Sequence, residues 1–231
     1  MDIEPLHSWD VTTSEARDLQ LELAGRVVTA PVGPWRTLAA ADVSFDRKGA
    51  DLYAAVVVVE AGTLAVVERV GVITPARFPY VPGLLSFREA PALLDAFAKL
   101  RARPDVVLID GQGLAHPRRF GIACHLGLWL DLPTVGCAKS RLCGEFEEPG
   151  PDRGDRSPLT DKGQVVGAVV RTRPRVKPLF LSQGHRSDLD GSIAVVLATL
   201  GKYRLPLPTR IAHEYVNAVR RAAKAGDPIP E

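Results

Sequence analysis

Stretches of apolar residues alternate with polar segments along the chain, and their apolar positions follow two different spacings. Residues 51–60 and 105–110 are short, nearly continuous apolar runs, which is typical of strands buried on both faces. In residues 10–28 apolar side chains recur every three or four positions, which predicts an amphipathic helix. The same patterns predict strands over residues 36–45, 51–60, 64–73, 105–110, 133–138, 164–170 and 178–182, and helices over residues 10–28, 89–103, 120–131, 187–200 and 209–224.

The order of these segments indicates the fold class. The first three strands follow one another closely, and Gly62 lies in the second connection, as a hairpin requires, so they predict an antiparallel meander. A helix and the buried strand 105–110 come next, which is the ribonuclease H-like order. We therefore expect an α/β fold in which residues 1–231 form a single domain. Its central mixed sheet would combine the three-strand meander with parallel strands, with helices on both faces.

Several boundaries are marked only weakly. The proline-rich stretch 78–87 predicts a loop, and residues 144–163, which are polar and rich in glycine and proline, predict an exposed loop. Neither Thr13 nor Ser14 is followed three residues later by Glu or Gln, so the capping signal of the first helix is poor. Pro91 indicates that the helix 89–103 starts just before it, because proline is tolerated in the first helical turn.

Composition and charge bear on which partners and which cell compartment we expect for this protein. A formal net charge of +2 permits an acidic partner without requiring one. No apolar run approaches the roughly 20 residues that span a bilayer, and the first ten residues lack the apolar core of a secretory signal. We therefore expect a cytoplasmic protein without membrane contact, acting as a monomer.

The three cysteines are Cys124, Cys137 and Cys143, and their spacing indicates buried free thiols. An odd count without a Cys-x-x-Cys pair disfavours a disulfide framework. A zinc site that adds His125 to the three thiols is the alternative. Because Cys124 and His125 are adjacent, and adjacent ligands rarely reach one tetrahedral ion, we disfavour it.

Three acidic residues occupy positions where a lone carboxylate would be costly. Asp42 lies within the apolar strand 36–45, and Asp110 ends the strand 105–110, at the sheet edge where ligands bind in open α/β folds. Glu89 precedes Leu93 by four residues and so falls on the apolar stripe of its helix. A shared cation would relieve the cost of burying these carboxylates, and Mg²⁺ prefers such oxygen ligands.

Each acid also has a purely structural interpretation. Asp110 could cap the turn that follows it, Asp42 could cap a bulge, and Glu89 could cap the start of its helix. The ribonuclease H-like order nevertheless places the first strand, the first helix of the sheet and the fourth strand around one site, which favours a single metal centre. A dinucleotide-binding loop after Asp110 is disfavoured, because His116 stands where the third glycine of that fingerprint would be.

Five contiguous segments carry a family resemblance. They resemble signature segments of the endonuclease V family of inosine-directed repair nucleases, and they occur in the family's order between Asp42 and His213. The family's fold is ribonuclease H-like, in agreement with the order of strands above. The segments are PYVPGLLSFRE at 79–89, DGQGLAHPRRFGIACHLG at 110–127, GCAKSRL at 136–142, SQGHRSDL at 182–189 and PTRIAH at 208–213.

The resemblance implies roles for individual residues. Asp42 and Asp110 would bind Mg²⁺, with Mn²⁺ able to substitute, and Glu89 would complete the carboxylate site. Lys139 and His213 would complete the catalytic set. The residues expected to contact DNA are Tyr80 as a wedge between Pro79 and Pro82, Gly83 and Leu85 in a base pocket, and Arg88 and His116 at phosphates.

The function implied by the resemblance is repair of deaminated DNA. The enzyme would flip deoxyinosine and hydrolyse the second phosphodiester bond on its 3′ side, leaving 3′-hydroxyl and 5′-phosphate ends. An endoribonuclease for inosine-containing RNA and a non-catalytic inosine-binding protein are the alternatives. The basic segment Arg171, Arg173, Arg175 and Lys177 is a further candidate for contact with the duplex backbone.

Overall fold

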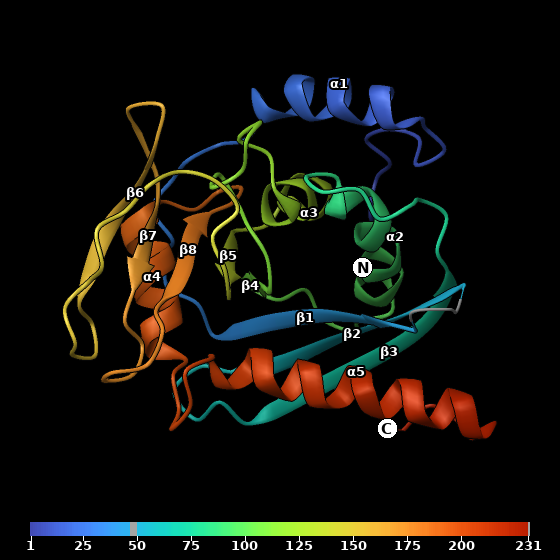
Figure 1. Cartoon of the computed structure of the whole chain (residues 1–231). Coiled ribbons are helices and arrows are strands. Elements are labelled where there is room, and N and C mark those ends of the chain that lie inside the picture. The colour runs from blue at the N-terminus through green and yellow to red at the C-terminus, as the bar shows by residue number, and fades with distance from the viewer. Residues whose placement is uncertain (47–49, 231) are drawn as a thin grey trace.

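The computed structural model describes residues 1–46 and 50–230, which fold around one eight-stranded mixed sheet (Figure 1). The strands are β1 Thr37–Phe45, β2 Asp51–Glu60, β3 Val66–Pro75, β4 Val106–Ile109, β5 Thr134–Ala138, β6 Arg156–Asp161, β7 Gln164–Val170 and β8 Leu179–Gln183. The helices are α1 Thr13–Ala24, α2 Leu85–Ala98, α3 Ile122–Leu130, α4 Leu189–Ala198 and α5 Leu207–Ala225.

The strand order across the sheet is β3-β2-β1-β4-β5-β8-β7-β6. The first three strands form the expected antiparallel meander, and β1, β4 and β5 run parallel. In the register of β1 and β4, Ala41 lies opposite Ile109, so the next residues, Asp42 and Asp110, reach the same level of the sheet. The topology therefore brings together two acids that are 68 positions apart in the sequence.

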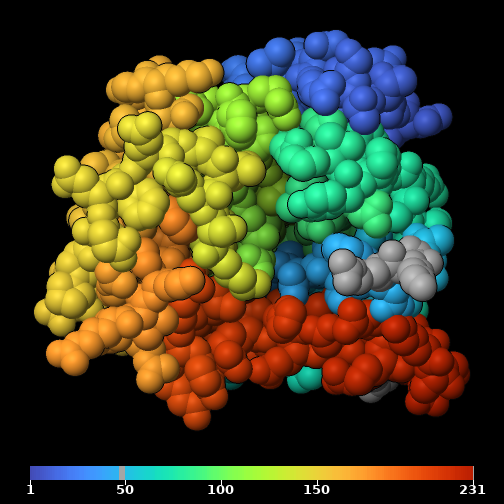
Figure 2. Space-filling view, in the orientation of Figure 1, coloured from blue at the N-terminus to red at the C-terminus, as the bar shows by residue number. Residues whose placement is uncertain are grey.

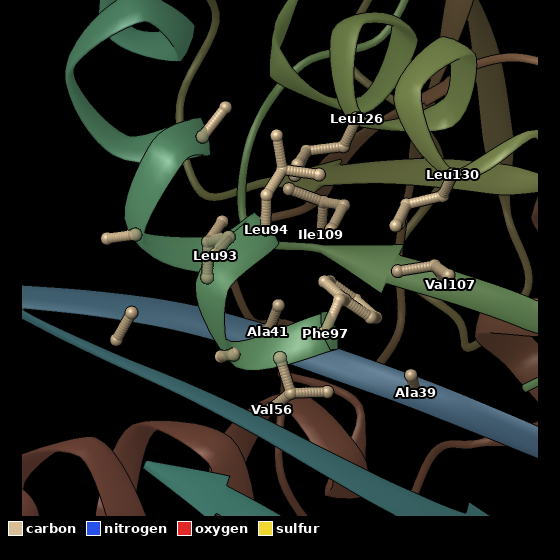
Figure 3. Close-up of a cluster of buried hydrophobic side chains, with 14 of the residues drawn as sticks. Ala39, Ala41, Val56, Leu93, Leu94, Phe97, Val107, Ile109, Leu126 and Leu130 are labelled. Atoms are coloured by element: carbon tan, nitrogen blue, oxygen red, sulfur yellow. The ribbon is translucent and has the colours of Figure 1, made fainter. Parts of the chain in front are cut away.

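Helices α2 and α3 cover one face of the sheet, and α4 and α5 cover the other, which confirms the expected layers (Figure 1). On the first face Leu93 and Phe97 of α2 pack against Ala39 and Ala41 of β1 and against Val56 of β2 (Figure 3). Alternate residues of the same strands face α5 on the other side. Burial on both faces explains why β2 is a continuous apolar run.

Helix α2 begins four residues before the predicted start. It runs from Leu85, and Leu84 makes no side-chain cap, so the sequence carried no capping signal. Pro91 lies inside the helix, where it cannot donate to the carbonyl one turn earlier. Burial of Leu93 and Phe97 outweighs that loss. Glu89 consequently lies within the helix, and the interpretation of Glu89 as an N-terminal cap is wrong.

Two further predictions of local structure are wrong. Helix α1 begins with a complete capping box, in which Thr12 and Glu15 bond to each other's backbone, so its start is well marked one residue before the positions considered. The segment 144–163, predicted to be a loop, contains the edge strand β6. Its pattern is weak because only Leu159 is fully buried and because Pro158 is tolerated at a sheet edge.

No helix within residues 1–46 and 50–230 is long and apolar enough to cross a membrane.

Candidate active site

Three carboxylates lie close together at the edge of the sheet where the pairing of the parallel strands β1 and β4 ends. Asp42 is a residue of β1, and Asp110 follows the last residue of β4. Glu89 comes from α2, which packs over this part of the sheet. The side chains of Asp42 and Asp110 are only 12% and 16% exposed to solvent. The carboxylate centre is therefore largely shielded from water.

The electrostatics show that the three carboxylates act on one another. Burial, together with the charges of Asp42 and Asp110, raises the pKa of Glu89 to about 8, although Arg88 opposes the shift. Burial and the charge of Asp110 also raise the pKa of Asp42, while His213 opposes that shift. Removing a proton from Glu89 at neutral pH therefore requires a positive charge nearby.

Two basic side chains bind the aspartates. Lys139, just after β5, donates a hydrogen bond to Asp110 Oδ2. Burial alone would lower the pKa of Lys139, but this bond and the charges of Asp110 and Asp42 raise it overall. His213 of α5 donates from Nδ1 to Asp42 Oδ2 over 2.7 Å, and Asn217 donates to its Nε2 over 3.2 Å. The five residues of the predicted catalytic set thus come together from five separate parts of the chain.

A pocket of about 350 Å³ opens beside this centre, and both Asp110 and Lys139 line it. In Figure 2 the surface is hollowed between the teal segment that carries Tyr80 and the yellow segment after Lys139. The remaining wall comes from the loop 79–84 (the wedge loop, after the role predicted for Tyr80), the start of α2, the loop after Asp110 and the segment after Lys139. Its members include Pro82, Gly83, Leu85, Ser86, Gln112, His116, Ile122 and Leu142.

The loop before α2 presents Tyr80 to solvent. Its side chain is 64% exposed and lies between Pro79 and Pro82 in the sequence. Gly83 has a φ of +78°, which only glycine adopts without strain, and a Cβ there would lie 2.9 Å from Arg118 Nη2. The carbonyl oxygen of Gly83 accepts three hydrogen bonds, from Gln20 Nε2, His116 Nε2 and Arg118 Nη2.

His116 lines the pocket, but its side chain is bound within the protein. It is 3% exposed, and its Nε2 donates to Gly83 over 3.0 Å instead of facing solvent. Burial and the charge of Arg118 lower the pKa of His116 to about 4, so the ring is neutral. The structure therefore gives His116 a place in holding the wedge loop.

Two of the arginines that are candidates for phosphate contact have partners within the protein. Arg88 is half-buried, donates from Nη1 to the carbonyl of Phe78, and lies 5.5 Å from the centre of the Phe45 ring. Arg171 is buried and binds Gly150, Pro149, Val176 and Glu148, so it anchors the segment before β6. Arg173, Arg175 and Lys177 stay exposed.

Sequence reasoning did not single out Gln20, Ser86, Gln112 or Arg118. Gln20 follows Ala16 by one helical turn and is 1% exposed, so a polar residue on an apolar stripe was the available signal. Arg118 gave no such signal, because its partners Gln20 and Gly83 are distant in sequence.

The cysteines have no place in this centre. Cys124 and Cys137 are buried free thiols, as predicted, and Cys143 is partly buried. Burial raises the pKa of Cys124 to about 12, which leaves it protonated and inert. Within the described residues, no group of three or more His, Cys, Asp or Glu side chains is positioned to hold a metal ion. Asp42, Glu89 and Asp110 supply the carboxylate oxygens that hard cations prefer, but their side chains would have to move closer together to bind one.

Comparison with known proteins identifies relatives over nearly the whole chain. The sequence model of the Endonuclease V family matches residues 21–214. Endonuclease V of Gloeobacter violaceus is 49% identical over 222 residues, covering 94% of this chain and 90% of that protein. The crystal structure of Endonuclease V from Streptomyces avermitilis superposes with a TM-score of 0.88 at 44% identity, covering 95% and 96% of the two chains.

A third relative was solved with nucleic acid. Endonuclease V of Ciona intestinalis, in complex with a 24mer DNA containing an inosine followed by a ribo-adenosine, superposes with a TM-score of 0.80. It is 26% identical, and the match covers 93% of this chain and 98% of that one. These structures have the α/β fold expected from the order of strands.

Proposed function

Because the chain belongs to the endonuclease V family, it is a nuclease, and we propose that it cuts DNA that contains deoxyinosine. Cleavage would fall at the second phosphodiester bond on the 3′ side of the lesion and leave 3′-hydroxyl and 5′-phosphate ends. The observation that carries the proposal is that the carboxylate centre and the pocket share Asp110 and Lys139 as wall residues. A base held in the pocket would thus place the backbone of its own DNA strand next to the three carboxylates.

We further propose that Mg²⁺ is the cofactor, with Mn²⁺ able to substitute, and that Asp42, Glu89 and Asp110 hold it. The fit rests on the donor set, which is three oxygen ligands whose mutual repulsion and burial raise the pKa of Glu89 to about 8. When bound, the cation would polarise the scissile phosphate and lower the pKa of an attacking water.

The remaining residues have complementary tasks in this proposal. Lys139 places a positive charge at the pocket rim, where it can stabilise the negative charge that develops on the phosphate. His213, held between Asp42 and Asn217, can pass a proton to or from water at the same edge. Tyr80 can fill the gap left in the duplex, because its ring is exposed on a proline-bounded loop.

The deciding experiment is a nicking assay on a duplex with one deoxyinosine, with Mg²⁺ or with EDTA. We expect cleavage at the second 3′ bond only with metal, and loss of cleavage in Asp110→Asn, which is nearly isosteric. Failure of the wild type to cut, or full activity of Asp110→Asn, would exclude the proposal. A matched RNA strand tests the alternative substrate, since preference for it would require contact with the 2′-hydroxyl.

A further inference from the structure

A line of polar groups runs from the N-terminal segment to the pocket wall. Trp129 Nε1 donates to His7 Nε2 over 3.4 Å, and that nitrogen lies 2.7 Å from His125 Nε2. His125 Nδ1 lies 3.0 Å from Ser86 Oγ, and Ser86 lines the pocket. His125 has no exposed surface, and Ser86 is 2% exposed although it lines the pocket, so the bond between them is shielded from bulk water.

The protonation of His7 is fixed because one of its hydrogen-bond partners can only accept and another can only donate. Its Nδ1 lies 2.7 Å from the carbonyl oxygen of Ser8, which can only accept, so Nδ1 carries the proton. The indole of Trp129 can only donate, so Nε2 of His7 presents a lone pair. Burial lowers the pKa of His7, which favours this neutral form.

The protonation of His125 follows from that of His7. Two imidazole nitrogens 2.7 Å apart need one proton between them, and since His7 offers a lone pair, His125 must donate from Nε2. Burial lowers the pKa of His125 well below its usual range, so the ring is neutral and its Nδ1 accepts. Among residues 1–46 and 50–230, the donor that meets Nδ1 is the hydroxyl of Ser86, whose proton is therefore committed to His125.

We propose that Ser86 is a specificity-determining residue that presents only a hydrogen-bond acceptor to the base in the pocket, with His125 and His7 as positioning residues. The inference rests on the proposed function, in which a flipped base occupies this pocket. Hypoxanthine carries a proton on N1 beside its O6 oxygen, whereas adenine has a lone pair on N1. The Ser86 oxygen would accept a hydrogen bond from N1–H of hypoxanthine, whereas it would be repelled by the N1 lone pair of adenine.

The start of α2 completes this complementarity. Ser86 lies in the first turn of the helix, where the N–H groups of Leu85 and Ser86 precede any acceptor within the helix, whereas that of Phe87 donates to Leu84. Such donors suit the O6 oxygen, so one residue and its helix end can offer a donor and an acceptor to the –NH–CO– edge of hypoxanthine. The hydrogen-bonded series His7, His125 and Ser86 acts as a relay. It turns the Ser86 hydroxyl, which can ordinarily both donate and accept a hydrogen bond, into a group that only accepts one from the base.

The first test compares Ser86→Ala with the wild type on duplexes that carry either deoxyinosine or deoxynebularine, a purine without the N1 proton and without O6. Binding in EDTA and cleavage with Mg²⁺ are both measured. We expect Ser86→Ala to lose roughly tenfold on deoxyinosine and much less on deoxynebularine. Equal losses on both bases would make Ser86 merely structural and overturn the inference. Failure of the wild type to cleave deoxyinosine would instead overturn the proposed function.

The second test uses a matched pair at His7. His7→Phe keeps an aromatic ring against Trp9 and Trp129 but offers no lone pair, so His125 is free to move its proton to Nδ1. His7→Gln keeps an acceptor oxygen. We expect His7→Phe to show the reduced preference for deoxyinosine that Ser86→Ala shows, and His7→Gln to keep the wild-type preference. Any other pattern in variants that melt like the wild type would overturn the relay.

The third test is direct. ¹⁵N NMR of histidine-labelled wild-type protein distinguishes a protonated from an unprotonated ring nitrogen. We expect the proton of His125 on Nε2 and that of His7 on Nδ1. The opposite assignment at His125 would overturn the proposal, whatever the variants do.

Discussion

His213 donates from Nδ1 to the carboxylate of Asp42 over 2.7 Å, and this bond joins the last helix to the first strand across 171 positions of the chain. Asn217, one helical turn further along α5, donates to the other ring nitrogen and to the backbone carbonyl of His213. The ring therefore has a defined orientation and tautomer at the carboxylate centre.

We expect His213→Ala to lose cleavage rate without losing stability. The side chain of His213 is 58% exposed, so little packing is lost, whereas general acid–base groups typically contribute roughly 10²–10⁴-fold to a rate. Single-turnover cleavage of a deoxyinosine duplex measures the effect. Glu214→Gln, a neighbouring exposed change on α5, is the control and should cleave normally. A rate loss of less than about fivefold would remove His213 from the catalytic set.

The buried carboxylate of Glu89 predicts a pH-dependent difference in stability between Glu89→Gln and the wild type. The pKa of Glu89 is about 8 in the folded protein and 4.5 as its ordinary value, so the folded state holds an extra proton between these limits. Stability of the wild type therefore falls as pH rises through this window, and Glu89→Gln escapes that loss.

Denaturant melts in EDTA measure this difference. At pH 9 we expect Glu89→Gln to be more stable than the wild type by a few kcal/mol, and at pH 5 the two should be nearly equal. Mg²⁺ should narrow the gap at pH 9, because a bound cation stabilises the ionised carboxylates of the wild type. A gap that is the same at both pH values would contradict the electrostatic explanation.

Replacement of Tyr80 should separate duplex recognition from chemistry. We expect Tyr80→Ala to raise the KM for a deoxyinosine duplex by roughly tenfold or more, since base–aromatic stacking contributes about 1–3 kcal/mol. Tyr80→Phe keeps the ring and should behave as the wild type. Because the ring is 64% exposed, the melting temperature should not change in either variant. An equal loss in both variants would point to the hydroxyl instead of the ring.

Gly83 and Gly62 form a matched pair for the wedge loop. Both have φ near +80°, but a Cβ at Gly62 meets nothing within 4 Å, whereas one at Gly83 would press on Arg118. We expect both Gly→Ala variants to lose about 1 kcal/mol of stability from backbone strain. Only Gly83→Ala should also lose affinity for deoxyinosine DNA. Normal binding by Gly83→Ala would show that the three bonds to this carbonyl do not position the loop.

Arg171 and Arg173 are expected to differ although they are near neighbours. Arg171→Met should lower stability by about 1–3 kcal/mol, because it leaves buried carbonyls without their donor. Arg173 is exposed, so Arg173→Met should leave the free energy of unfolding unchanged. The salt dependence of DNA binding then tests contact with the backbone, since a lost phosphate contact lowers the slope by about one. An unchanged slope would remove Arg173 from the interface.

The sequence by itself determined seven of the eight strands of the sheet and the two aspartates at its edge, but not the edge strand β6. Strands buried on both faces appear as continuous apolar runs, and their order predicts the meander and the parallel strands. Asp42 and Asp110 interrupt or end such runs, so both could be recognised without the structure. Tyr80 was recognised because its proline-bounded segment resembles a family signature.

The tertiary structure decided which partners the polar side chains have. Apolar periodicity reports burial, but it does not report which distant group a buried donor will meet. His116 binds Gly83 across 33 positions and His7 binds His125 across 118, and each pairing exists only because separate elements pack together. The start of α2 is set in the same way, since packing of its apolar face, and no capping side chain, places Leu85 first and aligns Glu89 with the two aspartates.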